Sequence, residues 1–212
     1  MTNKTAVLDR ILGLGPVMPV LVINDVAEAV PLARALVDNG LRVLEVTLRT
    51  PNSLAVIACL AEAVPEAAIG AGTVTSAESL AAVERAGASF AVSPGLTPAL
   101  AAAARDSALP LLPGVMTASE AMAAAEAGFT RLKLFPALQA GGVGMLKALH
   151  GPLPALRFCP TGGVSPDNAR DFLALPNVMC VGGSWITPDA LIRARAWDKI
   201  GELARAAAAL RG

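Results

Sequence analysis

The chain has 212 residues, enough for one large domain whose core needs neither disulfides nor metal ions. Hydrophobic residues make up 54% of the chain and aromatic residues only 3%, while 17 Lys and Arg residues balance 17 Asp and Glu residues. A neutral chain with so few aromatic side chains lacks the positive field and the stacking surfaces of nucleic-acid-binding proteins, so we expect no nucleic-acid partner.

Several features that the sequence lacks bear on where the protein is located and on whether it binds a metal ion. The first ten residues have no apolar signal-peptide core, and Pro and Gly interrupt every apolar run before it reaches the roughly 18 residues that span a bilayer. We therefore expect a cytoplasmic protein with no membrane partner. Cys59, Cys159 and Cys180 lie far apart in apolar stretches and are expected to be buried thiols. His150 is the only histidine, which excludes a site of several His ligands, and we expect no metal.

Short apolar runs of β type alternate with Ala-rich helical segments along the whole chain. A helix at about 5–12 is expected to come first. The expected strands cover 17–23, 41–48, 67–70, 89–93, 109–112, 129–135, 156–159 and 178–181. The expected helices, the first of them capped by Asp25 and stopped by Gly40, cover 25–39, 51–64, 76–86, 97–107, 118–127, 142–149, 165–173 and 188–210.

This order of elements predicts the fold class. Eight strand–helix units form parallel sheets, and they favour a single (β/α)8 barrel (a TIM barrel) over residues 1–212, with the first helix as an extra N-terminal helix. The alternative is an open doubly wound sheet. That fold would favour a GxGxxG segment after the first strand, and the chain has none there.

Small residues and prolines follow five of the expected strands, at the end where this barrel fold holds its chemistry. The segments are GAGT at 70–73, SPG at 93–95, LPG at 112–114, PTGG at 160–163 and GGS at 182–184. Gly162 and Gly163 precede a helix expected to open at Ser165. Loops after the last two strands commonly bind phosphate, so these segments predict a phosphate site; tight turns without a ligand are the alternative.

Two strands carry charged residues that alternation turns toward the barrel axis. In the 42–49 segment, Glu45 and Arg49 share a face with Thr47, and in the 131–136 segment Lys133 lies between outward leucines. Apolar walls and a nearby cation favour a neutral lysine amine, which can form a Schiff base with a carbonyl carbon. Structural alternatives are a Glu45–Arg49 pair, or Lys133 reaching the rim to pair with Glu45.

The same segments resemble a known family. VLEVTLRT (43–50), GAGTV (70–74), SPGLT (93–97), LPGVMT (112–117), KLFP (133–136), RFCPTGGVSPDN (157–168) and CVGGSW (180–185) resemble the 2-keto-3-deoxy-6-phosphogluconate (KDPG) and 4-hydroxy-2-oxoglutarate (KHG) aldolases over nearly the whole chain. The resemblance implies a metal-free class I aldolase of the Entner–Doudoroff pathway. It also implies a cytoplasmic homotrimer that needs no cofactor, acts on a phosphorylated 2-keto acid and releases pyruvate.

The resemblance also implies a role for each residue that matches the family's motifs. Lys133 would form the Schiff base and Glu45 would move protons. Arg49 and Thr73 would hold the substrate carboxylate, and Thr161 would distinguish epimers at C4. The remaining expected contacts are the phosphate-binding Gly162, Gly163, Gly183 and Ser184, and the pocket walls Pro94 and Phe135.

Two other functions use the same residues differently. A metal-dependent aldolase or isomerase on this fold would need ligands that one histidine and scattered carboxylates do not supply. A non-catalytic phosphosugar-binding barrel would use the glycine-rich ends, but it gives no reason for an inward lysine and glutamate. Both are less favoured than the lysine aldolase.

Overall fold

The structure is a computed structural model that describes residues 2–210. Its helices are α1 (Thr2–Leu12), α2 (Val26–Val37), α3 (Ser53–Ala63), α4 (Ala77–Arg85), α5 (Pro98–Asp106), α6 (Ala118–Glu126), α7 (Gly142–His150), α8 (Ala169–Leu173), α9 (Asp189–Arg193) and α10 (Trp197–Ala208). Its strands are β1 (Val17–Leu21), β2 (Val43–Thr47), β3 (Ala68–Gly72), β4 (Phe90–Val92), β5 (Leu111–Leu112), β6 (Gly114–Val115), β7 (Arg131–Leu134), β8 (Arg157–Pro160) and β9 (Val181–Gly183).

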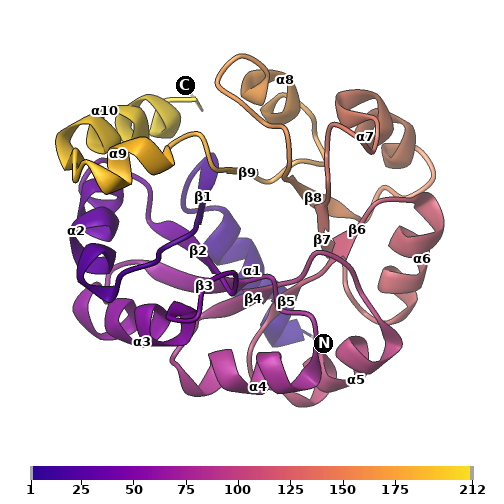
Figure 1. Cartoon of the computed structure of the whole chain (residues 1–212). Helices are drawn as coiled ribbons and strands as arrows, with labels where there is room; N and C mark the ends of the chain where they lie inside the picture. The colour runs from indigo at the N-terminus through magenta and orange to yellow at the C-terminus, as the bar shows by residue number, and fades with distance from the viewer. Residues whose placement is uncertain (1, 211–212) are drawn as a thin grey trace.

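The fold is α/β, with curled parallel strands at its centre, helices α2 to α10 outside them, and α1 behind the centre (Figure 1). Six strands follow the order β5-β4-β3-β2-β1-β9, and a second sheet has the order β6-β7-β8. Single parallel bridges, Phe158 to Val178 and Thr161 to Gly182, connect β8 with the β9 segment. At the other junction, β5 and β6 are separated by Pro113 alone, whose carbonyl accepts the Lys133 N–H.

Two apolar layers hold the strands in place. The outer layer packs the outward side chains of the strands, such as Leu44 and Leu132, against the surrounding helices. The inner layer lies among the strands and includes Met18, Phe90 and Cys159, together with Leu8, Ile11 and Leu12 of α1. The helix α1 therefore packs its apolar face against inward residues of the strands.

Most expected elements appear within a few residues of their expected ends, and the expected cap at Asp25 is confirmed. The Asp25 side chain accepts the Ala27 N–H at the start of α2, and Ser76 and Thr117 form capping boxes at α4 and α6. These side chains satisfy backbone N–H groups that have no partner within the helix.

Four expectations about element boundaries are wrong, and the one at the start of α8 is described with the site below. The expected fifth strand continues past Pro113 as β6, because proline has no N–H and interrupts the ladder without turning the chain away. The last strand is Val181–Gly183 and not 178–181, although Val178 still makes a bridge to Phe158. The helix expected over 188–210 is broken into α9 and α10 near Arg195, whose φ of 50° lies in the left-handed region.

The break before α10 has a packing reason that helix propensity alone cannot reveal. Alanine and arginine both favour helix, so the sequence reads as one continuous segment. In the structure, α10 packs on α2, burying Ile200, Gly201 and Ala204. The turn at Arg195 redirects the chain onto that surface. Among the described residues, no helix is both long and apolar enough to span a membrane.

Candidate active site

Lys133 reaches the interior because β7 alternates strictly. Leu132 and Leu134 are fully buried in the outer layer, between strands and helices, so the side chain between them points to the other face. Only 5% of Lys133 is exposed. Its ammonium nitrogen lies 5.2 Å from the centre of the Phe135 ring, within the range of a cation–π contact.

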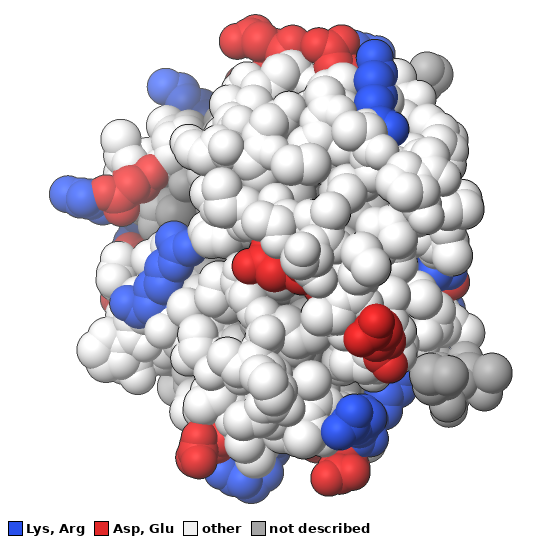
Figure 2. All heavy atoms as spheres, turned by 90° about the vertical axis from the view of Figure 1, so that its right-hand side faces the viewer, with Lys and Arg blue, Asp and Glu red and all other residues white. Residues whose placement is uncertain are grey.

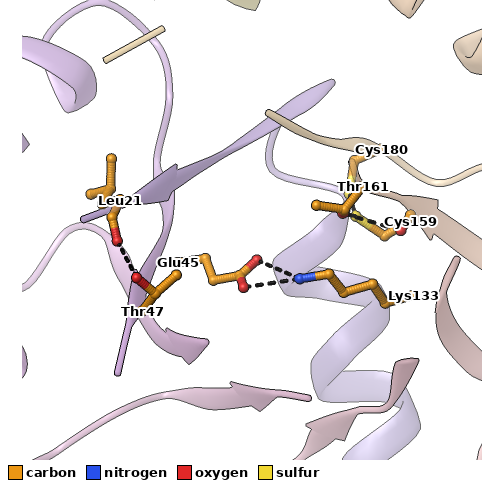
Figure 3. A network of polar contacts seen from close by, with 7 residues as sticks. All are labelled: Leu21, Glu45, Thr47, Lys133, Cys159, Thr161 and Cys180. Atoms are coloured by element: carbon orange, nitrogen blue, oxygen red, sulfur yellow. Dashed lines mark hydrogen bonds and ion pairs between the residues drawn. The ribbon is translucent and has the colours of Figure 1, made fainter. Parts of the chain in front are cut away.

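Glu45 reaches the same interior from β2 by the same rule. Leu44 and Val46 pack outward, and Glu45 is 1% exposed. The Lys133 Nζ donates to Glu45 Oε1 at 3.1 Å and lies 3.5 Å from Oε2 (Figure 3). The structure thus brings together two residues that are 88 positions apart in the chain.

Burying this ion pair lowers the stability of the fold, so its presence indicates a role other than stability. Removing two charges from water costs several kcal/mol per ion, and their mutual attraction does not always offset that cost. A leucine pair would pack here without the penalty. The two groups are also within the distance needed for direct proton exchange, so the carboxylate can take a proton from the amine and leave it nucleophilic.

Glycine in β3 makes room for the carboxylate. A Cβ at Gly72 would lie 2.3 Å from Glu45 Oε1 and 2.8 Å from its Cγ, so no other residue type leaves this carboxylate where it is. Gly70, two positions earlier, leaves similar room for the Phe90 ring. These two glycines therefore accommodate side chains of the protein itself, whereas the sequence had suggested that they admit a ligand.

Three of the expected binding residues follow neighbouring strands at one edge of the sheet. Arg49 follows β2, Thr73 follows β3 and Pro94 comes shortly after β4, and these strands are adjacent and parallel. Arg49 and Pro94 are exposed and Thr73 is half-buried. Thr73 has a φ of 63°, an unfavourable backbone conformation for a β-branched residue and one that tends to occur at functional sites.

The expected phosphate residues lie at the ends of β8 and β9. Gly162 and Gly163 have φ values of 100° and 78°, which a residue with a side chain rarely adopts. Thr161 is buried, and a Cβ at Gly182 would lie 2.2 Å from its Oγ1. Ser184 is exposed directly after β9. Gly183 is buried, and its missing side chain leaves room for the Trp185 ring.

The helix expected to open at Ser165 begins four residues later. The structure has α8 at Ala169–Leu173, and the residues before it form a turn in which the Ser165 N–H donates to Asn168 Oδ1. Asn168 also donates to the Gly163 carbonyl. The backbone N–H of Ser165 is therefore already used within the protein, and the expectation of a helix start beside Gly162 and Gly163 is wrong.

The structure distinguishes between the two possible partners of Glu45. Glu45 pairs with Lys133 and not with Arg49, because Arg49 lies beyond the end of β2 and is exposed. Sequence reasoning placed Thr47 on the inward face without a role. Its hydroxyl donates to the Leu21 carbonyl at 2.9 Å, which ties β2 to β1 beside Glu45 (Figure 3).

Chemistry rather than cavity size identifies this site. A cavity of about 400 Å³ lies elsewhere, lined by residues of α1, the end of α5 and the start of β7. Within it, Lys4 donates to the carbonyls of Ala104 and Arg105, and Arg131 pairs with Asp9. Lys4 and Arg131 therefore already have protein partners, whereas Lys133 and Glu45 are buried and contact each other.

Comparison with known proteins agrees with this site. The family model described as "Aldolase: KDPG and KHG aldolase" matches residues 8–203. The 2-dehydro-3-deoxy-phosphogluconate aldolase of Pseudoalteromonas atlantica is 55% identical over 195 residues, which are 92% of this chain and 91% of that protein. The KHG/KDPG aldolase of Escherichia coli is 50% identical over 207 residues, 98% of this chain and 97% of that protein.

A solved structure is similar over nearly the whole chain. It is the KDPG aldolase of Legionella pneumophila, described with pyruvate captured at low pH as a covalent carbinolamine intermediate. Its TM-score is 0.93 at 45% sequence identity, and the match covers 98% of each chain. A carbinolamine is the adduct that an amine forms with a ketone, the chemistry that a neutral lysine supplies.

Proposed function

The chain belongs to the KDPG and KHG aldolase family and is a carbon–carbon lyase, and we propose that Lys133 and Glu45 carry out its reaction. The enzyme reversibly cleaves KDPG to pyruvate and glyceraldehyde 3-phosphate, and it also cleaves KHG to pyruvate and glyoxylate. The observation that supports this assignment of residues is the buried contact of 3.1 Å between Lys133 Nζ and Glu45 Oε1.

The first half of the reaction builds an electron sink. Glu45 takes a proton from the Lys133 ammonium, and the neutral amine adds to the C2 carbonyl of the substrate to give a carbinolamine. Proton transfer through Glu45 then lets the carbinolamine lose water and become a protonated Schiff base. The apolar surroundings of the pair keep bulk water from competing for these protons.

The second half breaks the carbon–carbon bond. Glu45 removes the proton of the C4 hydroxyl, the electrons of the C3–C4 bond move to the Schiff-base nitrogen, and the aldehyde product leaves. Protonation of the resulting enamine at C3 and addition of water release pyruvate and restore the Lys133 amine. One carboxylate within hydrogen-bond reach of the amine supplies the base for each step.

The remaining expected residues serve to hold the two ends of the substrate. Arg49 and Thr73 are proposed to bind the carboxylate, since they follow adjacent strands at one edge of the sheet. Thr161 is proposed to bind a substrate hydroxyl, and Pro94 and Phe135 to wall the pocket. The proposed phosphate contacts are Gly162, Gly163, Gly183 and Ser184.

We propose that the two sheets form one closed (β/α)8 barrel, that residues 1–212 are one domain, and that α1 is its extra N-terminal helix. The bridges between β8 and β9, and the continuous chain through β5, Pro113 and β6, support closure at both junctions. The packing of α1 on inward residues of the strands supports its place at one end of the barrel.

The protein is proposed to act as a cytoplasmic homotrimer. Figure 2 looks at the side that carries α6 and α7, where charged side chains are isolated among broad uncharged areas. Met116, Met122 and Leu138 belong to α6 or to segments next to α6 and α7, and are 38%, 52% and 46% exposed. Such a surface favours contact with another copy of the chain. A monomeric mass by light scattering at micromolar concentration would contradict this proposal.

Borohydride trapping tests the assignment directly. Enzyme incubated with pyruvate and borohydride should carry one stable pyruvate-derived adduct, which peptide mapping should place on Lys133. Lys133→Ala should give no adduct and no cleavage while keeping its circular dichroism, and Lys147→Ala, on the outer helix α7, should behave as wild type. An adduct on another residue would contradict the assignment to Lys133. No adduct in folded wild-type protein would contradict the lysine chemistry and favour a phosphosugar-binding barrel.

A further inference from the structure

Two thiols of the inner layer lie in contact beside the proposed active site. Cys159 is on β8, and Cys180 directly precedes β9, the neighbouring strand segment. They are 0% and 2% exposed, and the Cys180 thiol donates to Cys159 Sγ with the two sulfurs 3.6 Å apart (Figure 3). The proposed reaction does not use either sulfur.

From this contact we infer that Cys159 and Cys180 form a site of oxidative modification, which hydrogen peroxide converts to a disulfide that blocks cleavage. Disulfide sulfurs are about 2.05 Å apart, so the pair must close by roughly 1.5 Å. Backbone bridges on both sides of the pair, Phe158 to Val178 and Thr161 to Gly182, already hold the two segments together, so the thiols do not have to find each other.

Hydrogen peroxide is the two-electron oxidant that disulfide formation requires. The Cys159 sulfur attacks one peroxide oxygen, which breaks the O–O bond; the thiol proton passes to the departing oxygen, giving a sulfenic acid and one water. The Cys180 sulfur then attacks the sulfenic sulfur, forming the S–S bond and releasing a second water. The two thiols lose two hydrogens in total, and the peroxide is reduced to two waters.

The cross-link would disturb the site from beneath. Cys159 is the register partner of Lys133 on the neighbouring strand. Its Sγ also lies 3.9 Å from Thr161 Oγ1, and the Thr161 hydroxyl lies 3.4 Å from the Cys159 carbonyl. Drawing Cys159 toward β9 therefore moves both Thr161 and the strand beside the lysine.

The expected loss of activity is large. A misplacement of about 1 Å near reacting groups costs on the order of 100-fold in rate, so the oxidised enzyme should cleave substrate about 100-fold more slowly. This loss rests on the proposed role of Lys133, whereas formation of the disulfide does not. The two parts can therefore fail separately.

The experiment follows cross-link and activity in the same samples. Full-length enzyme, first shown to be active and to form the pyruvate adduct, is treated with hydrogen peroxide, alkylated in denaturant and mapped by mass spectrometry. We expect a linked peptide pair containing residues 159 and 180, a parallel loss of cleavage, and recovery of both with dithiothreitol.

Matched variants separate this site from general oxidation. Cys59→Ser removes the half-buried thiol outside the inner layer and should leave the cross-link and the reversible loss unchanged. Cys180→Ser, or Cys180→Ala if the serine variant fails to fold, should give no cross-link and no thiol-reversible loss. The inference would be overturned by peroxide oxidation of Cys59 without a 159–180 link. It would also be overturned by a complete link in enzyme that keeps full activity.

Discussion

The absent side chain at Gly72 is what allows Glu45 to reach Lys133, and Gly72→Ala should therefore impair catalysis. The added Cβ would lie 2.3 Å from Oε1 and 2.9 Å from Cδ of Glu45. Since the carboxylate is the free end of a flexible side chain, it should move aside, and the protein should remain folded. Relief of the overlap requires a shift of about 1 Å, which near reacting groups costs on the order of 100-fold in rate.

The assay is steady-state cleavage of KDPG, coupled to reduction of the pyruvate formed. A rate loss of about 100-fold corresponds to about 2.7 kcal/mol of transition-state stabilisation. Because Gly72→Ala acts through Glu45, it should cost little more in a Glu45→Gln background, which a double-mutant cycle would show as strong non-additivity.

Gly70→Ala provides the matched control on the same strand and face. Its Cβ would lie 2.2 Å from Cζ of Phe90, a fully buried ring that cannot move into solvent. This variant should lose about 1–3 kcal/mol of unfolding free energy through overpacking, with a smaller effect on turnover in the folded fraction. Near-wild-type turnover of folded Gly72→Ala, or full additivity with Glu45→Gln, would show that Gly72 does not act through the position of Glu45.

Three further predictions concern stability and leave the reacting pair alone. Asp25→Ala removes the cap of α2 and should lower the unfolding free energy by about 1 kcal/mol in urea titration, with unchanged turnover. Asp9→Ala removes the pair that ties α1 to Arg131 of β7, at 2.5 Å, and should cost up to about 1 kcal/mol, less at high salt. The Met116 N–H donates a hydrogen bond to the Glu120 carboxylate and lowers the pKa of this mostly exposed capping residue below its unfolded-state value of 4.5. The stabilisation is therefore complete above pH 4.5 and is lost as pH falls through the lower folded-state pKa. Wild type should therefore be slightly more stable than Glu120→Gln at neutral pH, and thermal melts at acidic pH should show the two converging; a constant difference across pH would exclude this cause.

The sequence was sufficient to predict which strand side chains point inward and which point toward the helices. Period-2 spacing in the segments around Leu44 and Leu132 turned Glu45 and Lys133 inward, because successive side chains of a strand point to opposite faces. Helix caps such as Asp25 were equally readable, since capping depends on residues close together in the chain. The resemblance in motifs then supplied the family, which the comparisons confirmed.

Contacts between distant segments became visible only in the folded protein. The sequence left both Arg49 and Lys133 as possible partners for Glu45. In the curled sheet, Glu45 contacts Lys133, which is 88 residues away in the chain. The space at Gly72 and the meeting of Cys159 with Cys180 arise from neighbouring strands, so no single segment encodes them. Helix propensity likewise predicted one continuous helix at the end of the chain. The structure instead has a turn at Arg195, after which α10 packs on α2. Burial of a helix face outweighs small differences in propensity.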